Sequence, residues 1–425
     1  MIRNWSGSVT ETPTSYVQPE SPAELVSVLE GARKVRVIGA GHSFTPLAFC
    51  ADTMVNIDHI RGIVSLDRER KRVRFYAGTR LRDIPALLAP YGLALANQGD
   101  VNPQSVAGAV STGTHGTGLG YTGFAGMVTG VRLLQADGTW LDVDTSHPDF
   151  PFYQLTLGML GIITEVEFQC VDAFDLIARE SKVPFDEILE DFPQRASRTD
   201  HVEYFWFPGT DHVILKENER VKPGDVSEVE PPTKATLFFN KEVMDNGLFR
   251  LTNEISRLVP ALTEPINRIA TTLASNRTYR APAHDVFVSP RRVRFHEMEY
   301  AVPLADGAEV LTEIRAIIAA NGWKISFPLE VRCARADSVA MSTAVGRDTM
   351  YIAAHVFDKV NPVEYFSAIE PVFRAAGGRP HWGKMNSLTR TDITELYPRA
   401  EEFRALARRV DPDGVFATPY VAKLR

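Results

Sequence analysis

The sequence predicts an α+β protein built from two domains. Its 425 residues exceed the usual size of one domain, and 44% hydrophobic with 23% charged residues is the composition of an ordinary globular chain. Along the chain, short β-branched segments alternate with amphipathic helical ones. We therefore expect two compact units, with room for a cleft between them.

The first half of the chain starts with a predicted helix. Ser21 has the position of its capping residue, Pro22 stands at its first turn, and it ends near Gly31. A β-branched run over 34–38 follows and stops at Gly39-Ala40-Gly41, so a strand leads into a glycine-rich loop. We expect further strands at 72–77, 128–135, 140–143 and 163–170, with 136–138 as a hairpin turn.

From about residue 172 the pattern changes to longer strands. We expect strands at 202–207, 294–302, 330–335 and 351–357, and helices at 247–274, 307–321, 361–376 and 399–409. Residues 218–234 are rich in Glu, Pro and Lys, which is typical of an exposed loop.

The net charge and the cysteine content indicate which binding partners and which cellular compartment to expect. The net charge is −7, from 46 Lys+Arg against 53 Asp+Glu, and no basic run is present that could follow a nucleic-acid backbone. Cys50, Cys170 and Cys333 are far apart and form neither a disulfide framework nor a CxxC site. Residues 1–7 lack the apolar stretch of a secretory signal, and no run approaches the roughly 18 apolar residues of a membrane span. We expect a cytoplasmic protein with no nucleic-acid partner, no membrane span and no metal.

Two glycine-rich stretches are candidate cofactor loops. Gly39-Ala40-Gly41 after a strand could bind the pyrophosphate of a dinucleotide, but position 44 is Phe and no helix clearly begins there. A nicotinamide fingerprint is therefore disfavoured, and a simple turn remains an alternative. Residues 99–118 are also crowded with Gly, Ser and Thr, and such a loop exposes its backbone to a large polar ligand.

With these loops, the sequence resembles the vanillyl-alcohol-oxidase-type flavoproteins, and within them the aldonolactone and alditol oxidases. The resemblance covers almost the whole chain and rests on segments 37–44, 105–108, 112–118, 157–162, 330–332 and 381–384. It implies a two-domain PCMH-type fold, with an FAD-binding domain at 1–175, joined by the C-terminal tail 386–425, and a substrate (cap) domain at 176–385. The implied cofactor-binding residues are Gly39, Ala40, Gly41, His42, Ser43, Ser105, Gly108, Thr112, Gly113, His115, Gly118, Gly161 and Ile162.

His42 has the position at which the resemblance implies a covalent 8α-histidyl link to FAD. A neutral imidazole is a competent nucleophile toward an electrophilic flavin methyl group. Without the resemblance, a lone histidine is more often structural. His115 lies in the second loop, where a structural or flavin-contacting role is implied. That loop contains no cysteine, so we expect a single link.

Glu330 and Arg332 are two residues apart on a predicted strand, so their side chains share a face. An arbitrary Glu-x-Arg pair is usually a surface ion pair. The resemblance places this pair in front of the flavin, together with Lys384. Arg332 and Lys384 can stabilise a developing negative charge on the substrate oxygen, and Glu330 can accept a hydroxyl hydrogen bond. Which group takes the proton stays open.

The substrate-binding residues are expected to be Ser105, His355 and Lys384. For Ser105 the alternative is a turn residue, and for His355 a buried structural histidine. His296 is assigned no chemistry. After Gly-Val-Phe near the C-terminus, residues 416–418 are Phe-Ala-Thr, where the resemblance leads one to expect Asn.

The function implied is oxidation of a sugar-derived alcohol by hydride transfer to flavin N5. An aldono-1,4-lactone of the gulono, galactono or arabinono type is the favoured substrate, with O2 as the acceptor and H2O2 as the product. The alternatives are an alditol oxidase acting on xylitol or sorbitol, a lactone dehydrogenase with poor oxygen reactivity, a nicotinamide enzyme, and a flavin-binding protein without catalysis.

Overall fold

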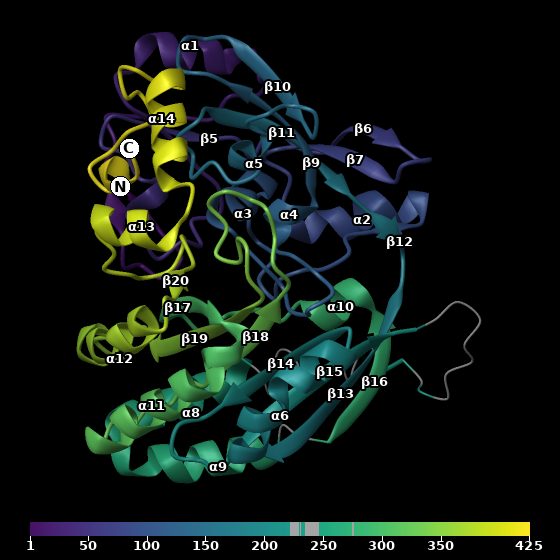
Figure 1. The fold of residues 1–425 in the computed structure, drawn as a ribbon, viewed down its shortest axis with the longest axis vertical. Coiled ribbons are helices and arrows are strands. Elements are labelled where there is room, and N and C mark those ends of the chain that lie inside the picture. The colour runs from purple at the N-terminus through teal and green to yellow at the C-terminus, as the bar shows by residue number, and fades with distance from the viewer. Residues whose placement is uncertain (222–228, 230, 234–245, 274–275) are drawn as a thin grey trace.

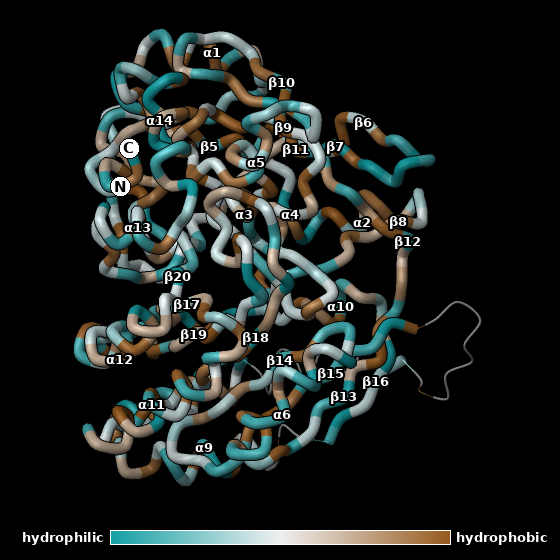
Figure 2. Tube along the Cα trace, viewed as in Figure 1, coloured by the Kyte–Doolittle hydropathy of each residue, from teal (hydrophilic) through white to brown (hydrophobic). Residues whose placement is uncertain are grey.

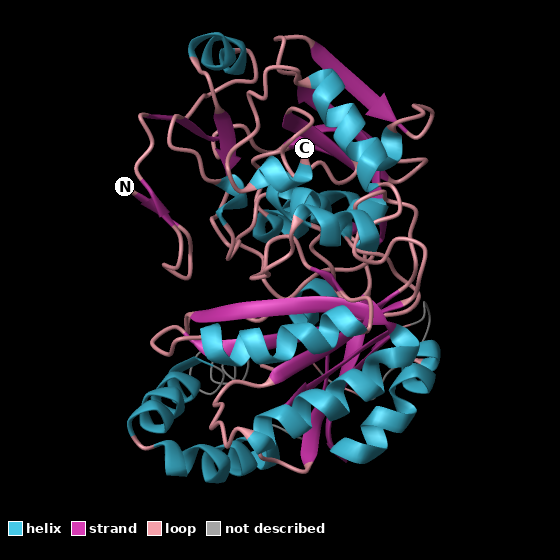
Figure 3. Ribbon diagram, turned by 60° about the vertical axis from the view of Figure 1, so that its left-hand side comes forward, coloured by secondary structure: helices cyan, strands magenta, loops and turns pink. Residues whose placement is uncertain are grey.

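The computed structural model describes residues 1–221, 229, 231–233, 246–273 and 276–425. Figure 1 shows two lobes stacked along the long axis. The N-terminal part of the chain and the yellow C-terminal tail form the upper lobe, and the teal and green middle of the chain forms the lower one. Figure 3 shows the long strands of the lower lobe as one sheet between the upper lobe and a layer of helices.

The upper lobe contains two main sheets. The first is antiparallel, in the order β10 (Trp140–Asp144), β9 (Val128–Leu134), β11 (Ile162–Gln169), β7 (Arg72–Tyr76) and β6 (Ile63–Asp67). The second is parallel, in the order β3 (Ser15–Val17), β5 (Thr53–Asn56) and β4 (Val35–Ile38). Two small pairs join β1 (Ile2–Arg3) to β2 (Thr10–Glu11), and β8 (Leu93–Ala94) to β12 (Val171–Asp172).

Short helices fill the space around these sheets. They are α1 (Glu24–Gly31), α2 (Ile84–Leu88), α3 (Val106–Thr112), α4 (Phe124–Met127), α5 (Phe150–Tyr153), α13 (Arg390–Leu396) and α14 (Ala400–Val410). The C-terminal tail packs on the parallel sheet, because the N–H of Val35 in β4 donates to the carbonyl of Val415 at 2.8 Å.

The lower lobe is built on one eight-stranded antiparallel sheet. Its order is β16 (Arg277–Pro282), β13 (Asp175–Pro184), β15 (His212–Arg220), β14 (His201–Trp206), β18 (Leu329–Ala334), β19 (Thr349–Phe357), β17 (Phe295–Pro303) and β20 (Arg379–Pro380). Its helices are α6 (Phe185–Arg198), α8 (Phe249–Leu258), α9 (Thr263–Leu273), α10 (Ala283–Phe287), α11 (Gly307–Ala320) and α12 (Val363–Ala375).

Each lobe has its own apolar core. The first cluster draws its buried residues from 25–170, 339–341 and 382–424, and the second from 183–373. In the second cluster, α6, α11 and α12 pack on one face of the eight-stranded sheet. Figure 2 shows hydrophobic stretches running through both lobes. The other face of the sheet is turned toward the upper lobe (Figure 1), and α10 packs on it against β13 and β16.

Most expected elements lie where the sequence predicts them, and two expectations are wrong. Ser21 does not cap α1: the helix begins at Glu24, and the Ser21 hydroxyl bonds the Glu24 carboxylate at 3.1 Å instead. The predicted loop 218–234 begins too early, because β15 continues to Arg220 through its pairing with β13. Residues 222–228, 230 and 234 of that loop lie outside the described residues. No described helix is long and apolar enough to cross a membrane.

Candidate active site

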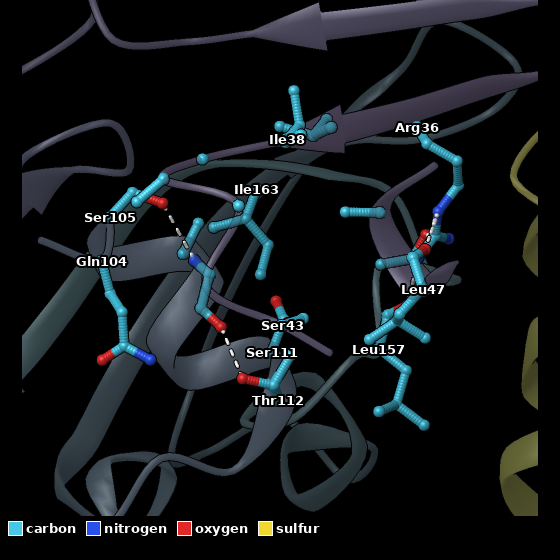
Figure 4. Close-up of a pocket in the computed structure, with 18 of the residues that line it drawn as sticks. Arg36, Ile38, Ser43, Leu47, Gln104, Ser105, Ser111, Thr112, Leu157 and Ile163 are labelled. Carbon is cyan, nitrogen blue, oxygen red and sulfur yellow. Dashed lines mark hydrogen bonds between the residues drawn. The ribbon is translucent and has the colours of Figure 1, made fainter. Parts of the chain in front are cut away.

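The first glycine loop follows β4 and borders a cavity of about 910 Å³ (Figure 4). The start of α3 lies beside this loop, and there the Ser105 hydroxyl accepts a hydrogen bond from the N–H of Gly108 at 3.3 Å. Gly161 and Ile162, at the start of β11, and Phe416 of the tail complete the lining. The cavity is therefore built by segments from both ends of the upper lobe's sequence.

The glycines of the first loop are needed for close approach. A Cβ at Gly39 would lie 2.4 Å from the Ser105 Oγ, and Gly41 has φ +68°, where side chains are strained. Within the described part of the chain, the backbone N–H groups of residues 40–43 make no hydrogen bond. Unpaired N–H groups in a glycine-rich turn are typical of phosphate-binding sites.

The cavity continues toward the sheet of the lower lobe. His42, Ser43, Gln104 and Thr112 line both this cavity and a second one of about 410 Å³. The second shares a further set of residues with a third cavity of about 510 Å³: Val101, Gln104, Arg291, Phe295, Glu297, His381 and Lys384. The three form one track from the glycine loop to the polar face of the eight-stranded sheet.

The polar face follows from strand alternation. In β14, β18, β19 and β17, every second residue enters the apolar core, and the residues between them face the upper lobe. The polar residues on this second face include Glu203 on β14, Glu330 and Arg332 on β18, Tyr351 and His355 on β19, and Glu297 and Glu299 on β17. Antiparallel register then sets them side by side.

Arg332 lies among three carboxylates. Its Nε donates to Glu203 Oε2 at 2.7 Å, its Nη2 lies 2.5 Å from Glu330 Oε1, and its Nη1 lies 3.7 Å from Asp100 Oδ1. Burial opposes its charge, but these carboxylates raise the pKa of Arg332 well above its usual value. Burial raises the pKa of Glu330 to about 7, although Arg332 acts in the opposite direction. The pair therefore combines a permanent cation with a carboxyl group that titrates near neutral pH.

Lys384 lies on the segment that joins the lobes. The Gly383 carbonyl accepts a hydrogen bond from the N–H of Phe44 at 2.6 Å. The N–H of Met385 donates to the backbone carbonyl of Glu297 at 2.9 Å. The Lys384 ammonium group pairs with the Glu297 carboxylate. Burial would raise the pKa of Glu297, but Lys384 and His355 lower it to about 2. The pKa of Lys384 is raised, because Glu297 outweighs the opposing effect of burial.

Two further histidines complete the site. His115 Nε2 lies 2.8 Å from Glu299 Oε1, and its ring stacks on Tyr351 with 3.5 Å between centroids. The N–H of Gly383 donates to His381 Nδ1 at 3.0 Å, and burial lowers the pKa of His381 to about 3. The ring of His42 stacks on Trp5, and burial lowers the pKa of His42 to about 4, with Lys384 acting in the same direction. His42 is therefore a neutral imidazole at physiological pH.

Comparison with known families shows the family of this chain. Residues 13–144 match the family described as FAD binding domain, and residues 166–424 match the family described as D-arabinono-1,4-lactone oxidase. The second match covers more than half of the chain. The chain belongs to the D-arabinono-1,4-lactone oxidase family.

Relatives of this family match over nearly their whole length. The L-gulono-1,4-lactone dehydrogenase of Mycobacterium tuberculosis is 34% identical over 426 residues, covering 99% of this chain and 98% of the relative. The L-gulonolactone oxidase of Mus musculus is 29% identical over 436 residues, covering 100% and 98%. The solved structure of cholesterol oxidase from B. sterolicum has a TM-score of 0.84 at 18% identity, covering 99% of this chain and 96% of that chain. This structural likeness confirms the expected two-domain flavoprotein fold.

The residues present fit an FAD group. The loop at 39–43 offers unpaired N–H groups for a pyrophosphate. Gln104 lines all three cavities, and its buried Oε1 has no hydrogen-bond partner among the described residues. A buried amide oxygen without a partner indicates a ligand donor at that point. The three cavities share lining residues from the glycine loop to the polar face of the sheet, so a ligand that extends from the loop to that face fits this arrangement.

Most of the residues singled out from the sequence line this track. Gly39, Ala40, Gly41, His42, Ser43, Ser105, Gly108, Thr112, Gly161 and Ile162 line the first cavity, and His115, Glu330, Arg332, His355 and Lys384 line the third. Gly113 and Gly118 do not line these cavities. Gly113 ends α3 with φ +77°, and the N–H of Gly118 donates to the Cys333 carbonyl at 2.9 Å.

Several residues of the site were not named as site residues from the sequence. Asp100, Gln104 and His381 lie in the segments 99–118 and 381–384, which the sequence does single out. Trp5, Arg291, Glu297 and Glu299 line the cavities outside those segments, and Glu203 lines none of them but contacts Arg332. For Glu297 and Glu299 a signal exists, since two carboxylates alternate with apolar residues along a predicted strand. Asp100 and Arg291, which form an ion pair, are separated by 191 positions, so only the fold reveals their pairing.

Proposed function

We propose that this protein oxidises an aldono-1,4-lactone of the gulono, galactono or arabinono type in the cavity between the two lobes. The observation that carries the proposal is the convergence of Glu330, Arg332 and Lys384 at the end of the track that starts at the glycine loop. The family match and the names of the relatives, which are lactone oxidases and dehydrogenases, support the substrate class.

When bound, FAD supplies a two-electron acceptor. The chain's own residues orient the substrate and stabilise charge. Arg332 and Lys384 donate hydrogen bonds to the reacting oxygen, and their charge stabilises the anion that develops as the hydroxyl proton leaves. Glu330 accepts the hydroxyl hydrogen bond and orients the carbon, and its pKa near 7 makes it a candidate proton acceptor. His355, Ser105 and Lys384 are proposed substrate contacts.

For His42 we propose the covalent 8α-histidyl link. Support comes from its place in the loop at the junction of the first two cavities and from its low pKa, which keeps the imidazole neutral and nucleophilic. Trp5 stacks on the ring with 5.1 Å between centroids and holds its orientation.

We propose that the two lobes, each with its own apolar core, have separate roles. Residues 1–175 with the tail 386–425 hold the cofactor, and 176–385 form the cap that carries the catalytic strand face. Cys50, Cys170 and Cys333 are buried free thiols, which supports a reducing, cytoplasmic location.

The acceptor is proposed to be O2, giving H2O2, with each lactone losing two electrons and two protons. A dehydrogenase is the second candidate, because the 34% identical relative carries that name. Steady-state assays with oxygen and with a dye acceptor separate the two. An oxidase turns over with O2 and releases H2O2, whereas a dehydrogenase turns over only with the dye.

Anaerobic stopped-flow reduction of the bound flavin tests the site itself. Arg332→Ala and Lys384→Ala should each slow reduction by a lactone about 10²- to 10³-fold, the usual cost of losing a donor to a developing anion. Arg335→Ala, an exposed arginine one residue beyond β18, is the matched control and should reduce at the wild-type rate. Normal reduction rates in both site variants would place the active site elsewhere.

A further inference from the structure

The helices α8 and α9 of the lower lobe carry an exposed apolar surface. All the exposed Leu and Ile side chains among the described residues lie between positions 248 and 273. Leu258 is 67% exposed, and Ile269 and Leu273 are each 60% exposed. In Figure 1 these helices lie at the lower end of the molecule, on the far side of the lobe from the cofactor-binding part. The outer surface consists of Leu248, Leu251, Leu258, Val259, Leu262, Ile269 and Leu273.

The same two helices bury their polar residues. Asn253 and Ser256 are the buried residues of α8, and Thr263, Asn267 and Thr271 are those of α9. This is the reverse of an ordinary surface helix, which buries its apolar stripe.

Specific contacts hold the polar side inward. The Asn267 Nδ2 donates to the carbonyls of Pro208 and Ile325, both at 3.0 Å, and the Ser326 hydroxyl donates to the Asn253 Oδ1 at 2.6 Å. The apolar surface is thus fixed outward by hydrogen bonds, and rotating either helix to bury it would break them.

The charges on this surface are mainly positive. Arg250 and Arg268 are exposed among the apolar side chains, and Arg257 is exposed but pairs with Glu254. The two acidic residues of these helices are neutralised by neighbours: Glu254 pairs with Arg257 and Lys359, and Glu264 pairs with Lys324. A second copy of the chain would present the same mainly positive surface, and the repulsion between two surfaces of like charge disfavours self-association through it. A surface of opposite charge is favoured instead.

We propose that α8 and α9 bind the surface of an anionic lipid bilayer. An exposed apolar stripe flanked by arginines is the pattern of helices that lie in the membrane interface without crossing it. Leu251, Leu258, Ile269 and Leu273 enter the boundary between headgroups and acyl chains, while the arginines contact anionic headgroups. The protein is then a peripheral membrane protein whose cofactor lobe points away from the lipid.

Vesicle sedimentation with the full-length flavoprotein tests the proposal. Vesicles of phosphatidylcholine alone are compared with an equimolar mixture of phosphatidylcholine and phosphatidylglycerol. We expect binding to the mixed vesicles at least about tenfold stronger than to the neutral ones, because each surface arginine near anionic lipid contributes on the order of a few-fold.

Two pairs of variants separate the contributions. Leu258→Gln/Ile269→Gln and Arg250→Gln/Arg268→Gln should each weaken binding to the mixed vesicles about tenfold or more. The matched controls are Val64→Gln/Tyr91→Gln and Arg33→Gln/Arg61→Gln, which change exposed residues of the upper lobe. The controls should bind like wild type, and all four variants should keep normal flavin content and turnover.

The proposal is overturned if the wild type does not bind the mixed vesicles, or if the α8–α9 variants bind them as well as the controls do. It is also overturned if sedimentation velocity shows a dimer that the Leu258→Gln/Ile269→Gln variant dissociates, because the apolar surface is then an interface between copies.

Discussion

At the scale of single residues, the burial of His42 decides its chemistry. Burial keeps its imidazole neutral, and the loop holds it between two cavities of the cofactor track. A free imidazole nitrogen can then form a bond to carbon, whereas an imidazolium cannot. For the proposed link, the environment of His42, rather than its residue type, is what would make the imidazole a nucleophile.

His42→Ala should fold and bind FAD but release the flavin on acid denaturation, with reduced turnover. Absorbance of the precipitate and of the supernatant measures the retained flavin. His59→Ala, an exposed histidine of the same lobe, is the control and should retain flavin like wild type. Flavin that stays attached to denatured His42→Ala protein would show that another residue forms the link.

The titration of Glu330 should appear in the pH profile. Because burial raises its pKa to about 7, the carboxylate that we propose as the acceptor of the hydroxyl proton forms only as the pH rises through that value. The kcat/KM for a lactone should therefore increase with pH through about 7 and then level off. In Glu330→Gln, kcat/KM should no longer increase with pH through about 7, and turnover should be about 10²- to 10⁴-fold slower. If kcat/KM of the variant still increases with pH through about 7, another group is the proton acceptor.

At the scale of elements, antiparallel strand pairing places charged side chains of β15, β14 and β18 next to one another. Lys216 on β15 and Glu203 on β14 lie opposite each other, with their charged groups 3.3 Å apart. Glu203 in turn accepts from Arg332 on β18. The contacts among Lys216, Glu203 and Arg332 fix the position of the Arg332 guanidinium. Its remaining N–H donors therefore face the cavity, and the side chain need not move to donate to a ligand.

Glu203→Gln should lower kcat/KM for the lactone by about tenfold through misplacement of Arg332. Because Glu203 positions another residue, kcat should fall more than KM rises, and Glu203→Asp should recover part of the rate. Glu219→Gln, which removes an exposed ion pair on β15, is the control for charge on this sheet. Flavin content and thermal unfolding exclude a folding defect. Equal losses in the Gln and Asp variants contradict the positioning role.

At the scale of the whole molecule, a buried arginine joins the C-terminal tail to three other segments of the upper lobe. Arg36 of β4 donates to the carbonyls of Leu47 and Leu157 at 2.8 Å, of Gly158 at 2.7 Å and of Phe416 at 3.1 Å. The Phe416 carbonyl belongs to the Gly-Val-Phe segment after which the resemblance leads one to expect Asn, and Phe416 lines the first cavity. The tail is therefore part of the site.

Arg36→Met should lower the free energy of unfolding by about 3–5 kcal/mol, because several buried carbonyls lose their donor. Urea unfolding followed by circular dichroism measures the loss, and the variant should also bind FAD less tightly. Arg33→Met, an exposed neighbour, should change stability by less than about 0.5 kcal/mol. A stable Arg36→Met protein would mean that the tail is held by other contacts.

Substrate choice also belongs to the whole molecule, since both lobes line the catalytic cavity. A γ-lactone is a compact ring, whereas an alditol is a flexible chain, and a site shaped for the ring leaves polar groups unpaired with the chain. One unpaired buried group costs roughly 1–3 kcal/mol, so kcat/KM for a gulono, galactono or arabinono 1,4-lactone should exceed that for xylitol or sorbitol at least about tenfold. Steady-state assays on both classes measure the ratio. A preference for xylitol or sorbitol would make the protein an alditol oxidase.

Features set by local backbone chemistry were predictable from the sequence. The strand that ends at Gly39, the glycine loop and the same-face placement of Glu330 and Arg332 depend on residues only a few positions apart. The fold class followed from the resemblance carried by these motifs and is confirmed by the structural comparison. The predicted helix cap at Ser21 is wrong because the Ser21 hydroxyl bonds the Glu24 carboxylate instead of a backbone N–H of the helix.

Only the tertiary structure decided which charges meet and which helix face is exposed. Asp100, Glu203 and Arg291 reach Arg332 or its neighbours through strand register and the packing of two lobes, over separations of more than 100 positions. In α8 and α9 the helical pattern was visible in the sequence, but an apolar stripe ordinarily predicts burial. Here the hydrogen bonds of Asn253 and Asn267 to the loop after α11 and to Pro208 turn the polar side inward. Such long-range contacts outweigh the local hydrophobic pattern, which by itself specifies a helix but not the surface against which it packs.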